Sequence, residues 1–163
     1  KRLMIIPRYP KHSDLRAAEE SYFRELLGCE PVYLGPEGLC SGYMAVDSAD
    51  VVVAIDSTLG YESIARGNKT AIFSIRSSSS ITPGMLKYGW PVDFPDVGPF
   101  WTNTPDPENF VRILDYLFEV NDTQWKEDVS MSDFSSLLMY DPGNTILKST
   151  LEKVLGAPSV IAD

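Results

Sequence analysis

Short apolar runs alternate along this chain with longer segments in which apolar residues recur at helical spacing. The short runs have the length of buried strands, and the run at 51–55 is rich in β-branched residues. The longer segments place apolar residues on one stripe of a helix. The pattern predicts strands at 3–6, 31–34, 51–55, 69–75 and 100–102, and helices at 14–27, 40–48, 57–67, 107–120 and from a cap at Asn144 onward.

The alternation of strands and helices predicts the fold class. Strand–helix–strand units imply parallel pairing and helices on both faces of a sheet. We therefore predict an α/β fold, a three-layer α/β/α Rossmann-like domain with a mainly parallel sheet of five or six strands. The strand at 51–55 is predicted to be central. With 163 residues and no repeats, residues 1–163 are predicted to form a single domain.

The segment from Ser77 to Pro99 interrupts this alternation. It is rich in Ser, Gly and Pro and keeps neither a helical nor a strand period. It also carries the aromatic residues Tyr88, Trp90 and Phe94. Packing of these rings over the sheet edge and closure of the loop over a ligand are two interpretations that stay open.

The turn after the strand at 51–55 is the strongest candidate for a binding site. Asp56, Ser57 and Thr58 stand where the next helix begins, and a helix N-terminus carries unpaired N–H groups and a partial positive charge. Such a turn holds a phosphate without a nearby lysine. Ordinary capping of the helix by the same side chains is the alternative. The position favours binding, because open α/β sheets bind ligands beyond the carboxyl ends of their strands.

Two further residues of this helix extend the candidate site. Gly60 would let a ligand come close to the first turn. Glu62 follows Thr58 by four positions and shares its face, so a hydroxyl and a carboxylate together are placed to hold a phosphate and a ribose. We predict that Ser57, Thr58 and Gly60 contact a phosphate and that Glu62 contacts a ribose.

The segment after the first strand is expected at the same edge of the sheet. Arg8 is its best candidate for a phosphate contact, because the planar guanidinium matches phosphate oxygens. Tyr9, Pro10 and His12 are further candidate contacts to the ligand. His12 is the only histidine, and the alternative is that it is a solvated surface residue, as lone loop histidines usually are.

The composition of the chain argues against several classes of partner and site. The 14 basic and 23 acidic residues give a net charge of −9, which argues against nucleic acid or an anionic membrane as a partner. No apolar run is long enough to span a bilayer and no secretory segment is present, so Cys29 and Cys40 are expected to be reduced in the cytoplasm, with a disulfide as the alternative. Metal-ligand spacings are missing, and no metal site is predicted. The first strand follows Lys1 almost at once, which suggests that an upstream portion is absent.

The segment ADVVVAIDSTLGYESIARGNK, residues 49–69, resembles the nucleotide-sugar-binding segment in the C-terminal half of GT-B glycosyltransferases. It is most similar to that of surface-carbohydrate and capsule-polysaccharide biosynthesis proteins, in which a strand is followed by Ser or Asp, Ser-Thr, Gly, an aromatic residue and Glu. The resemblance covers most of the chain. It extends from the turn at 7–10 to the closing YDPGNT at 140–145 and the last helix.

The resemblance implies that this chain is the donor-binding half of a longer, metal-independent glycosyltransferase of surface polysaccharide biosynthesis. In GT-B enzymes the acceptor and the catalytic base lie on the N-terminal domain, which is absent here, so catalytic residues are unknown and this chain alone would be inactive. No cofactor is implied beyond the substrate, a CMP- or UDP-linked sugar. The implied location is the cytoplasm, including the inner face of the membrane. Glu62 takes the role of the helix carboxylate that binds the ribose.

One position departs from the family pattern. In related transferases that use CMP-activated sugars, a His-Pro pair after an early strand and a Ser-Ser/Thr pair flank the donor phosphate. The pair at 57–58 matches, whereas Tyr9 and Pro10 stand where His-Pro is expected. Tyr9 supplies neither the proton nor the charge of histidine. Either Arg8 or His12 replaces it, or the donor is not a CMP sugar.

Two other functions stay open. A nucleotide-sugar 2-epimerase shares the fold and the phosphate turn but normally follows the turn with paired glutamates, and only Glu62 is present here. A non-catalytic Rossmann-like module that binds a regulatory nucleotide or a partner protein fits the acidic charge and the missing catalytic base.

Overall fold

A computed structural model describes residues 2–34, 41–76, 87–90 and 92–156. Over these ranges the chain forms parallel strands and helices in the alternation that the sequence predicts. The elements are β1 (Met4–Ile5), α1 (Asp14–Leu27), β2 (Val32–Tyr33), α2 (Ser41–Asp47), β3 (Val52–Ile55), α3 (Thr58–Ala65), β4 (Thr70–Phe73), β5 (Trp101–Thr102), α4 (Pro107–Glu119), α5 (Asp122–Met131), the 3-10 helix η2 (Phe134–Ser136) and α6 (Thr145–Leu155).

The strands of the described residues form two parallel sheets. β1 pairs with β2, and β3, β4 and β5 form a second sheet in that order. The predicted α/β class with parallel strands is confirmed, whereas the structure divides the strands between two sheets instead of one of five or six strands. β4 is central and β3 lies at an edge, so the predicted central place of the strand at 51–55 is wrong. An apolar run predicts burial, but it does not specify which strands become neighbours.

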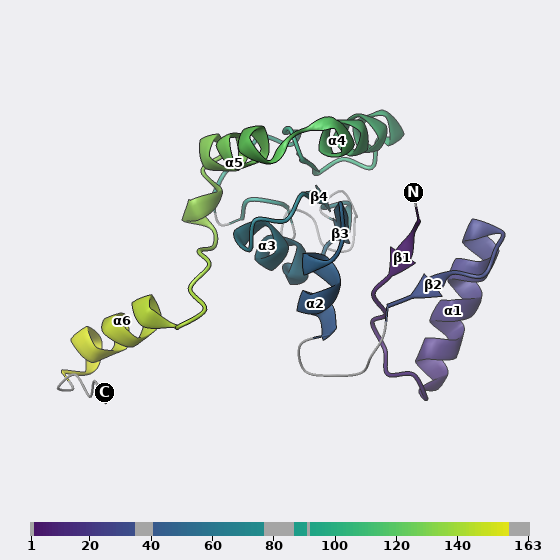
Figure 1. Cartoon of the computed structure of the whole chain (residues 1–163), viewed down its shortest axis with the longest axis horizontal. Coiled ribbons are helices and arrows are strands. Elements are labelled where there is room, and N and C mark those ends of the chain that lie inside the picture. Colours follow the sequence, from purple (N-terminus) through teal and green to yellow (C-terminus); the bar gives the residue numbers. More distant parts are fainter. Residues whose placement is uncertain (1, 35–40, 77–86, 91, 157–163) are drawn as a thin grey trace.

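Helices cover both faces of the second sheet (Figure 1). α3 and the adjoining α2 lie on one face, and α4 and α5 lie on the other. The close approach of α3 depends on Gly60, where a Cβ would lie 2.5 Å from Cβ of Ala54 and 2.6 Å from Cδ1 of Ile72. On the other face Phe73 packs against Phe110, with ring centroids 4.4 Å apart. These layers bury every residue of β4.

The aromatic residues before β5 pack into the core. Tyr88, Phe94 and Phe100 are buried, and each ring contacts the ring of Trp101. Trp90, in contrast, is 68% exposed. Packing is therefore the interpretation that holds for the described part of the loop. Residues 77–86 and 91 lie outside the described residues.

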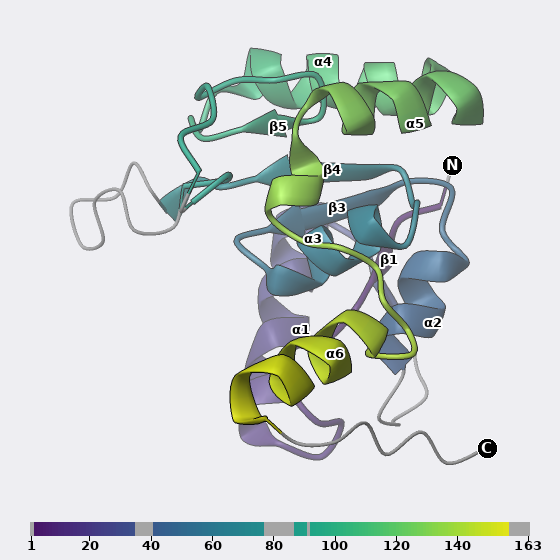
Figure 2. The same ribbon diagram turned by 90° about the vertical axis from the view of Figure 1, so that its left-hand side faces the viewer.

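The β1–α1–β2 unit lies on the flank of the second sheet (Figures 1 and 2). Ser13 caps α1 by accepting the Arg16 N–H at 3.2 Å. Arg16 is buried, bonds Glu20 at 2.6 Å and lies 4.1 Å from the ring centroid of Tyr33. A charged residue therefore joins α1 to β2, a role that its position among the apolar residues of the helix did not predict.

α6 projects away from the sheets in Figure 1. The helix is confirmed, but its predicted cap is wrong. Asn144 has a φ of 52° and makes no side-chain capping bond, and Asp141 accepts the Ile146 N–H at 2.8 Å instead. The reason is that an N-cap side chain reaches the helix from extended backbone, which Asn144 does not adopt.

Candidate functional site

Asp56 directly follows β3 and carries a buried carboxylate. Its φ is 48°, a left-handed conformation that residues other than glycine rarely adopt. The side chain is 1% exposed, and its Oδ2 accepts the Arg76 N–H at 3.2 Å and pairs with Nε of Arg76 at 3.3 Å. Oδ1 has no hydrogen-bond partner within the described residues. A buried carboxylate oxygen without a donor is costly, so it needs an explanation beyond the packing of the turn.

The hydroxyl groups at the start of α3 are not used to cap it. Ser57 has the extended backbone of an N-cap, with φ −120° and ψ 132°, yet its side chain makes no capping bond. Asp106 and Asn121, the N-caps of α4 and α5, both accept backbone N–H groups. Ser57 and Thr58 are exposed beside the N–H groups that a first helical turn leaves unpaired. The capping alternative therefore fails for Ser57.

Glu62 and Gly60 have different surroundings on α3. Glu62 is partly buried one turn beyond Thr58, as its spacing predicts. The bare side of Gly60 faces the sheet, so close packing on Ala54 is the physical reason for glycine there. The ligand approach predicted at Gly60 gains no support from this geometry.

The residues after β1 lie on the other sheet. The Arg8 N–H donates to Oε1 of Glu19 at 3.3 Å, and the Arg8 guanidinium lies 5.4 Å from the Tyr9 ring centroid. Pro10 and His12 are exposed in the same turn. Figures 1 and 2 both place this turn at the base of α1, away from the start of α3. The structure therefore brings 57–62 together and does not bring the four residues at 8–12 to them.

An ion pair joins α2 to the end of α3, on residues that the sequence analysis did not single out as a pair. Arg66 binds both carboxylate oxygens of Asp47, with Nε to Oδ1 at 2.8 Å, and Nδ2 of Asn68 donates to Oδ1 at 3.0 Å. These hydrogen bonds lower the pKa of Asp47 from 3.8 to about 2. The Arg66 guanidinium also lies over the rings of Tyr43 and Tyr140, 5.3 Å from each ring centroid. The cluster acts as a brace between distant segments, and no local sequence pattern signals it.

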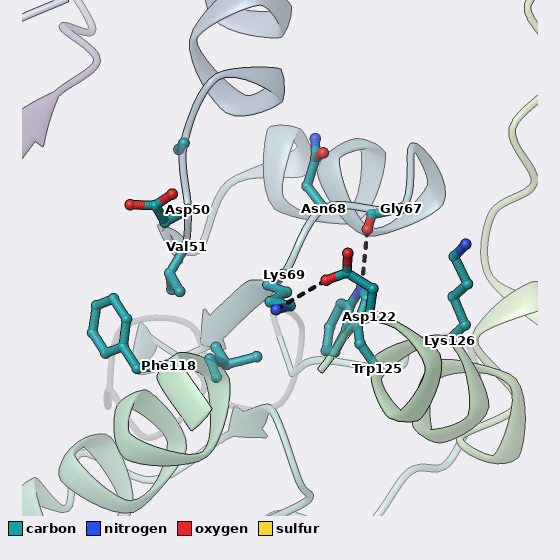
Figure 3. A pocket seen from close by; sticks show the side chains of 11 residues that line it. Asp50, Val51, Gly67, Asn68, Lys69, Phe118, Asp122, Trp125 and Lys126 are labelled. Atoms are coloured by element: carbon teal, nitrogen blue, oxygen red, sulfur yellow. Dashed lines mark hydrogen bonds and ion pairs between the residues drawn. The ribbon is translucent and has the colours of Figure 1, made fainter. Parts of the chain in front are cut away.

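A hollow of about 580 Å³ lies at the opposite, amino edge of the sheet (Figure 3). Its walls come from the segments before β3 and β4 and from the junction of α4 and α5. Lys69 Nζ donates to the Val120 carbonyl at 2.7 Å and pairs with Asp122 at 3.0 Å. Trp125 Nε1 donates to the Gly67 carbonyl at 3.0 Å. These bonds tie α5 to the sheet, so we interpret the hollow as a structural junction. The carboxyl edge stays the predicted place of a ligand site, because open α/β sheets bind ligands beyond the carboxyl ends of their strands.

The described residues were also compared with the requirements of a metal site, a membrane-spanning helix and a disulfide. Within the described ranges no three His, Cys, Asp or Glu residues cluster in a way that would hold a metal ion. None of the helices in these ranges has the length and apolar character needed to cross a membrane. Cys29 is a free, exposed thiol, and Cys40 lies outside the described residues.

Comparison with known proteins identifies the family. A model of the family described as "putative O-antigen biosynthesis protein" matches residues 4–155. The match spans nearly the whole chain, so the chain belongs to this family. Comparisons with curated proteins and with solved structures gave no match. The family description agrees with the surface-polysaccharide part of the resemblance, and the GT-B glycosyltransferase assignment stays a prediction.

Proposed function

We propose that this chain binds the nucleotide-sugar donor of a glycosyltransferase that acts in surface polysaccharide biosynthesis. The observation that carries the proposal is the start of α3, where the hydroxyls of Ser57 and Thr58 are exposed and Ser57 makes no capping bond, at a helix end where the first N–H groups lack intrahelical partners. The family membership supports the biosynthetic context. The resemblance to the GT-B donor half supports the reaction class.

Each residue of the turn has a distinct role in the proposal. The N–H groups of α3 and the hydroxyls of Ser57 and Thr58 bind the donor phosphate, where the helix dipole stabilises the charge that develops on the leaving nucleotide. Glu62 accepts a hydrogen bond from a ribose hydroxyl. Asp56 cannot face a phosphate favourably, because both are negative. Its Oδ1, which has no donor among the described residues, instead accepts a hydrogen bond from a hydroxyl group of the ligand.

This binding needs neither a metal nor a cofactor. Metal-independent transfer relies on backbone dipoles, hydroxyls and cations to stabilise the departing phosphate, and the turn supplies the first two. The acceptor glycan and the catalytic base belong to a domain outside this chain, so the proposed activity is that of a longer protein working in the cytoplasm. The alternative is a non-catalytic binding module. It would hold if the longer protein released no nucleotide from any sugar donor.

Calorimetric titration of CMP, UDP and their sugars tests the proposal. We expect one of the two bases to bind more tightly, which names the donor class. Thr58→Ala and Glu62→Ala should each weaken binding by about 1–3 kcal/mol, the cost of losing one partner of a charge-assisted hydrogen bond. That loss is roughly 5- to 150-fold in Kd.

α5 offers matched controls for these variants. Thr123 is an exposed threonine in the first turn of α5, and Glu127 lies one turn beyond it. Thr123→Ala and Glu127→Ala should leave nucleotide affinity unchanged. Equal affinity in all four variants, or no binding of any nucleotide to the unaltered chain, would refute the proposed function.

A further inference from the structure

Trp90 differs from the other two tryptophans of the chain. Trp101 and Trp125 are 4% and 2% exposed, and their indole N–H groups donate to the carbonyls of Pro95 and Gly67. Trp90 is 68% exposed, and its indole N–H meets no acceptor among the residues that the structure describes. The aromatic ring and the hydrogen-bond donor of Trp90 are therefore both accessible to a ligand.

The turn that carries Trp90 has a closely packed backbone. The Trp90 N–H donates to the Lys87 carbonyl at 3.2 Å, and the Val92 N–H donates to the Gly89 carbonyl at 2.6 Å. Gly89 has a φ of 97°, and a Cβ at this position would lie 2.7 Å from Cβ of Phe94. The exposed ring is therefore held on a backbone that is already ordered, which lowers the entropy cost of binding a ligand.

Hydrogen bonds fix this turn at the carboxyl edge of the second sheet. The Tyr88 N–H donates to Oδ1 of Asn103, the residue that directly follows β5, at 2.7 Å. The Gly89 N–H donates to the hydroxyl of Tyr61, one turn into α3, at 3.4 Å. Trp90 therefore stands at the same edge as the start of α3, where open α/β sheets bind their ligands.

The ionised groups beside the turn are mainly acidic. Lys87 Nζ pairs with Asp96 at 3.0 Å and with Asp93 at 3.7 Å. The carboxylates of Asp93 and Asp96 are both exposed, so one positive and two negative groups leave a net negative charge beside Trp90. This charge repels phosphate groups, and the carboxylate oxygens accept hydrogen bonds from hydroxyl groups. The surroundings of Trp90 therefore favour an uncharged ligand with many hydroxyls.

We propose that Trp90 is a stacking platform for a pyranose ring of the surface glycan on which the family acts. The C–H groups on one face of a pyranose pack flat against an indole ring, and its hydroxyls accept from the indole N–H and donate to nearby carboxylates. Membership of an O-antigen biosynthesis family supports a glycan as the ligand. The inference goes beyond the proposed function, in which a domain outside this chain holds the acceptor, because it adds a contact to the acceptor from this chain.

A protein partner fits this surface less well than a glycan does. A stable protein interface buries about 800 Å² on each side around an apolar centre. Trp90 instead stands beside the charged groups of Lys87, Asp93 and Asp96. A single ring next to charged groups is sufficient to stack on one sugar, and it is too small for the centre of a protein interface.

The NMR signals of the three indole N–H groups test the proposal without any nucleotide. The probes are maltotriose, chitotriose and methyl rhamnoside, each titrated to about 50 mM, well above a millimolar Kd. We expect the Trp90 signal to shift and to saturate with at least one probe. The signals of the buried Trp101 and Trp125 should stay in place. No shift of the Trp90 signal with any of the three probes would overturn the proposal.

Matched variants test whether the Trp90 ring itself binds the saccharide. Trp90→Ala should weaken binding about tenfold or more, and Trp90→Phe should retain most of it, because a phenyl ring still stacks. Tyr22→Ala, at an α1 ring that is 61% exposed, should leave binding unchanged. Saturation-transfer NMR on the saccharide signals measures all three, and thermal melts check that each variant folds. Equal binding by Trp90→Ala and Tyr22→Ala would overturn the proposal.

Titration of the same signals with CMP, UDP and their sugars separates this inference from the proposed function. A Trp90 signal that responds to saccharides in a chain that binds no nucleotide would support the glycan platform and refute the function. Nucleotide binding with a Trp90 signal that no saccharide shifts would support the function and refute the platform. A Trp90 signal that shifts only with CMP or UDP would assign the ring to the nucleobase. A shift that needs an intact nucleotide sugar would assign it to the donor sugar, and either result would overturn the proposal.

Discussion

Gly60 and Ala54 are in direct contact across the interface of α3 and β3, at a distance that leaves no space for a methyl group at position 60. Gly60→Ala should therefore lower the free energy of unfolding by about 1–3 kcal/mol through overpacking, less the gain of up to about 1 kcal/mol that alanine brings to a helix. Chemical denaturation followed by tryptophan fluorescence measures the change.

Gly42 in α2 is the matched control for this variant. A Cβ at Gly42 would lie 3.5 Å from Cδ2 of Leu59, an ordinary contact. Gly42→Ala should be neutral or stabilising. A Gly60→Ala protein as stable as Gly42→Ala would show that α3 does not pack as tightly as described.

The second prediction concerns Ser57, which occupies the N-cap position of α3 without making a capping bond. Asn121 accepts the N–H groups of Thr123 and Gln124, each at 3.0 Å, so Asn121→Ala should cost about 1 kcal/mol of stability. Ser57→Ala should stay within about 0.5 kcal/mol of the unaltered protein, because no capping bond is lost. Thermal melts of both variants measure these losses of stability. A loss in Ser57→Ala equal to that in Asn121→Ala would restore the interpretation of Ser57 as a capping residue.

The brace between Asp47 and Arg66 gives a prediction about acid. Because the pKa of Asp47 is lowered to about 2 in the folded protein from an ordinary 3.8, its stabilising effect is complete above pH 4 and disappears as the pH falls from about 4 to 2. Asp47→Asn should reduce stability at pH 7, and its difference from the unaltered protein should shrink over that interval.

Asp50, an exposed carboxylate close to Asp47 in sequence, supplies the control for the acid experiment. Asp50→Asn should leave stability nearly unchanged at pH 7. Urea titrations at several pH values compare the three proteins. A constant difference between Asp47→Asn and the unaltered protein down to pH 2 would contradict the assigned pKa.

Local patterns predicted the elements better than their assembly. The β-branched run of β3 and the helix after it lie where the sequence places them, because both depend on spacing and on residues a few positions apart. Strand order depends on contacts between distant segments, and the division into two sheets could not be read from the runs. The same limit applies to the brace, since Arg66 meets Asp47 and Tyr140 across long stretches of chain.

The candidate site was predicted in part. Ser57, Thr58 and Glu62 lie together because they share one turn and one helix, which spacing alone specifies. The sequence predicts Asp56 only as a capping side chain, because residue type signals neither the burial of its carboxylate nor its positive φ. Arg8 could be assigned to the site only by assuming one continuous sheet, which the described structure does not contain.

Mapping of backbone amide shifts during titration with CMP and UDP is the most direct test of the central claim that the start of α3 binds the nucleotide. We expect the largest shifts at Ser57, Thr58 and the residues that follow in the first turn, with small ones at the amino-edge hollow around Lys69 and Asp122. Largest shifts at that hollow, or no change at the α3 turn with either nucleotide, would contradict it.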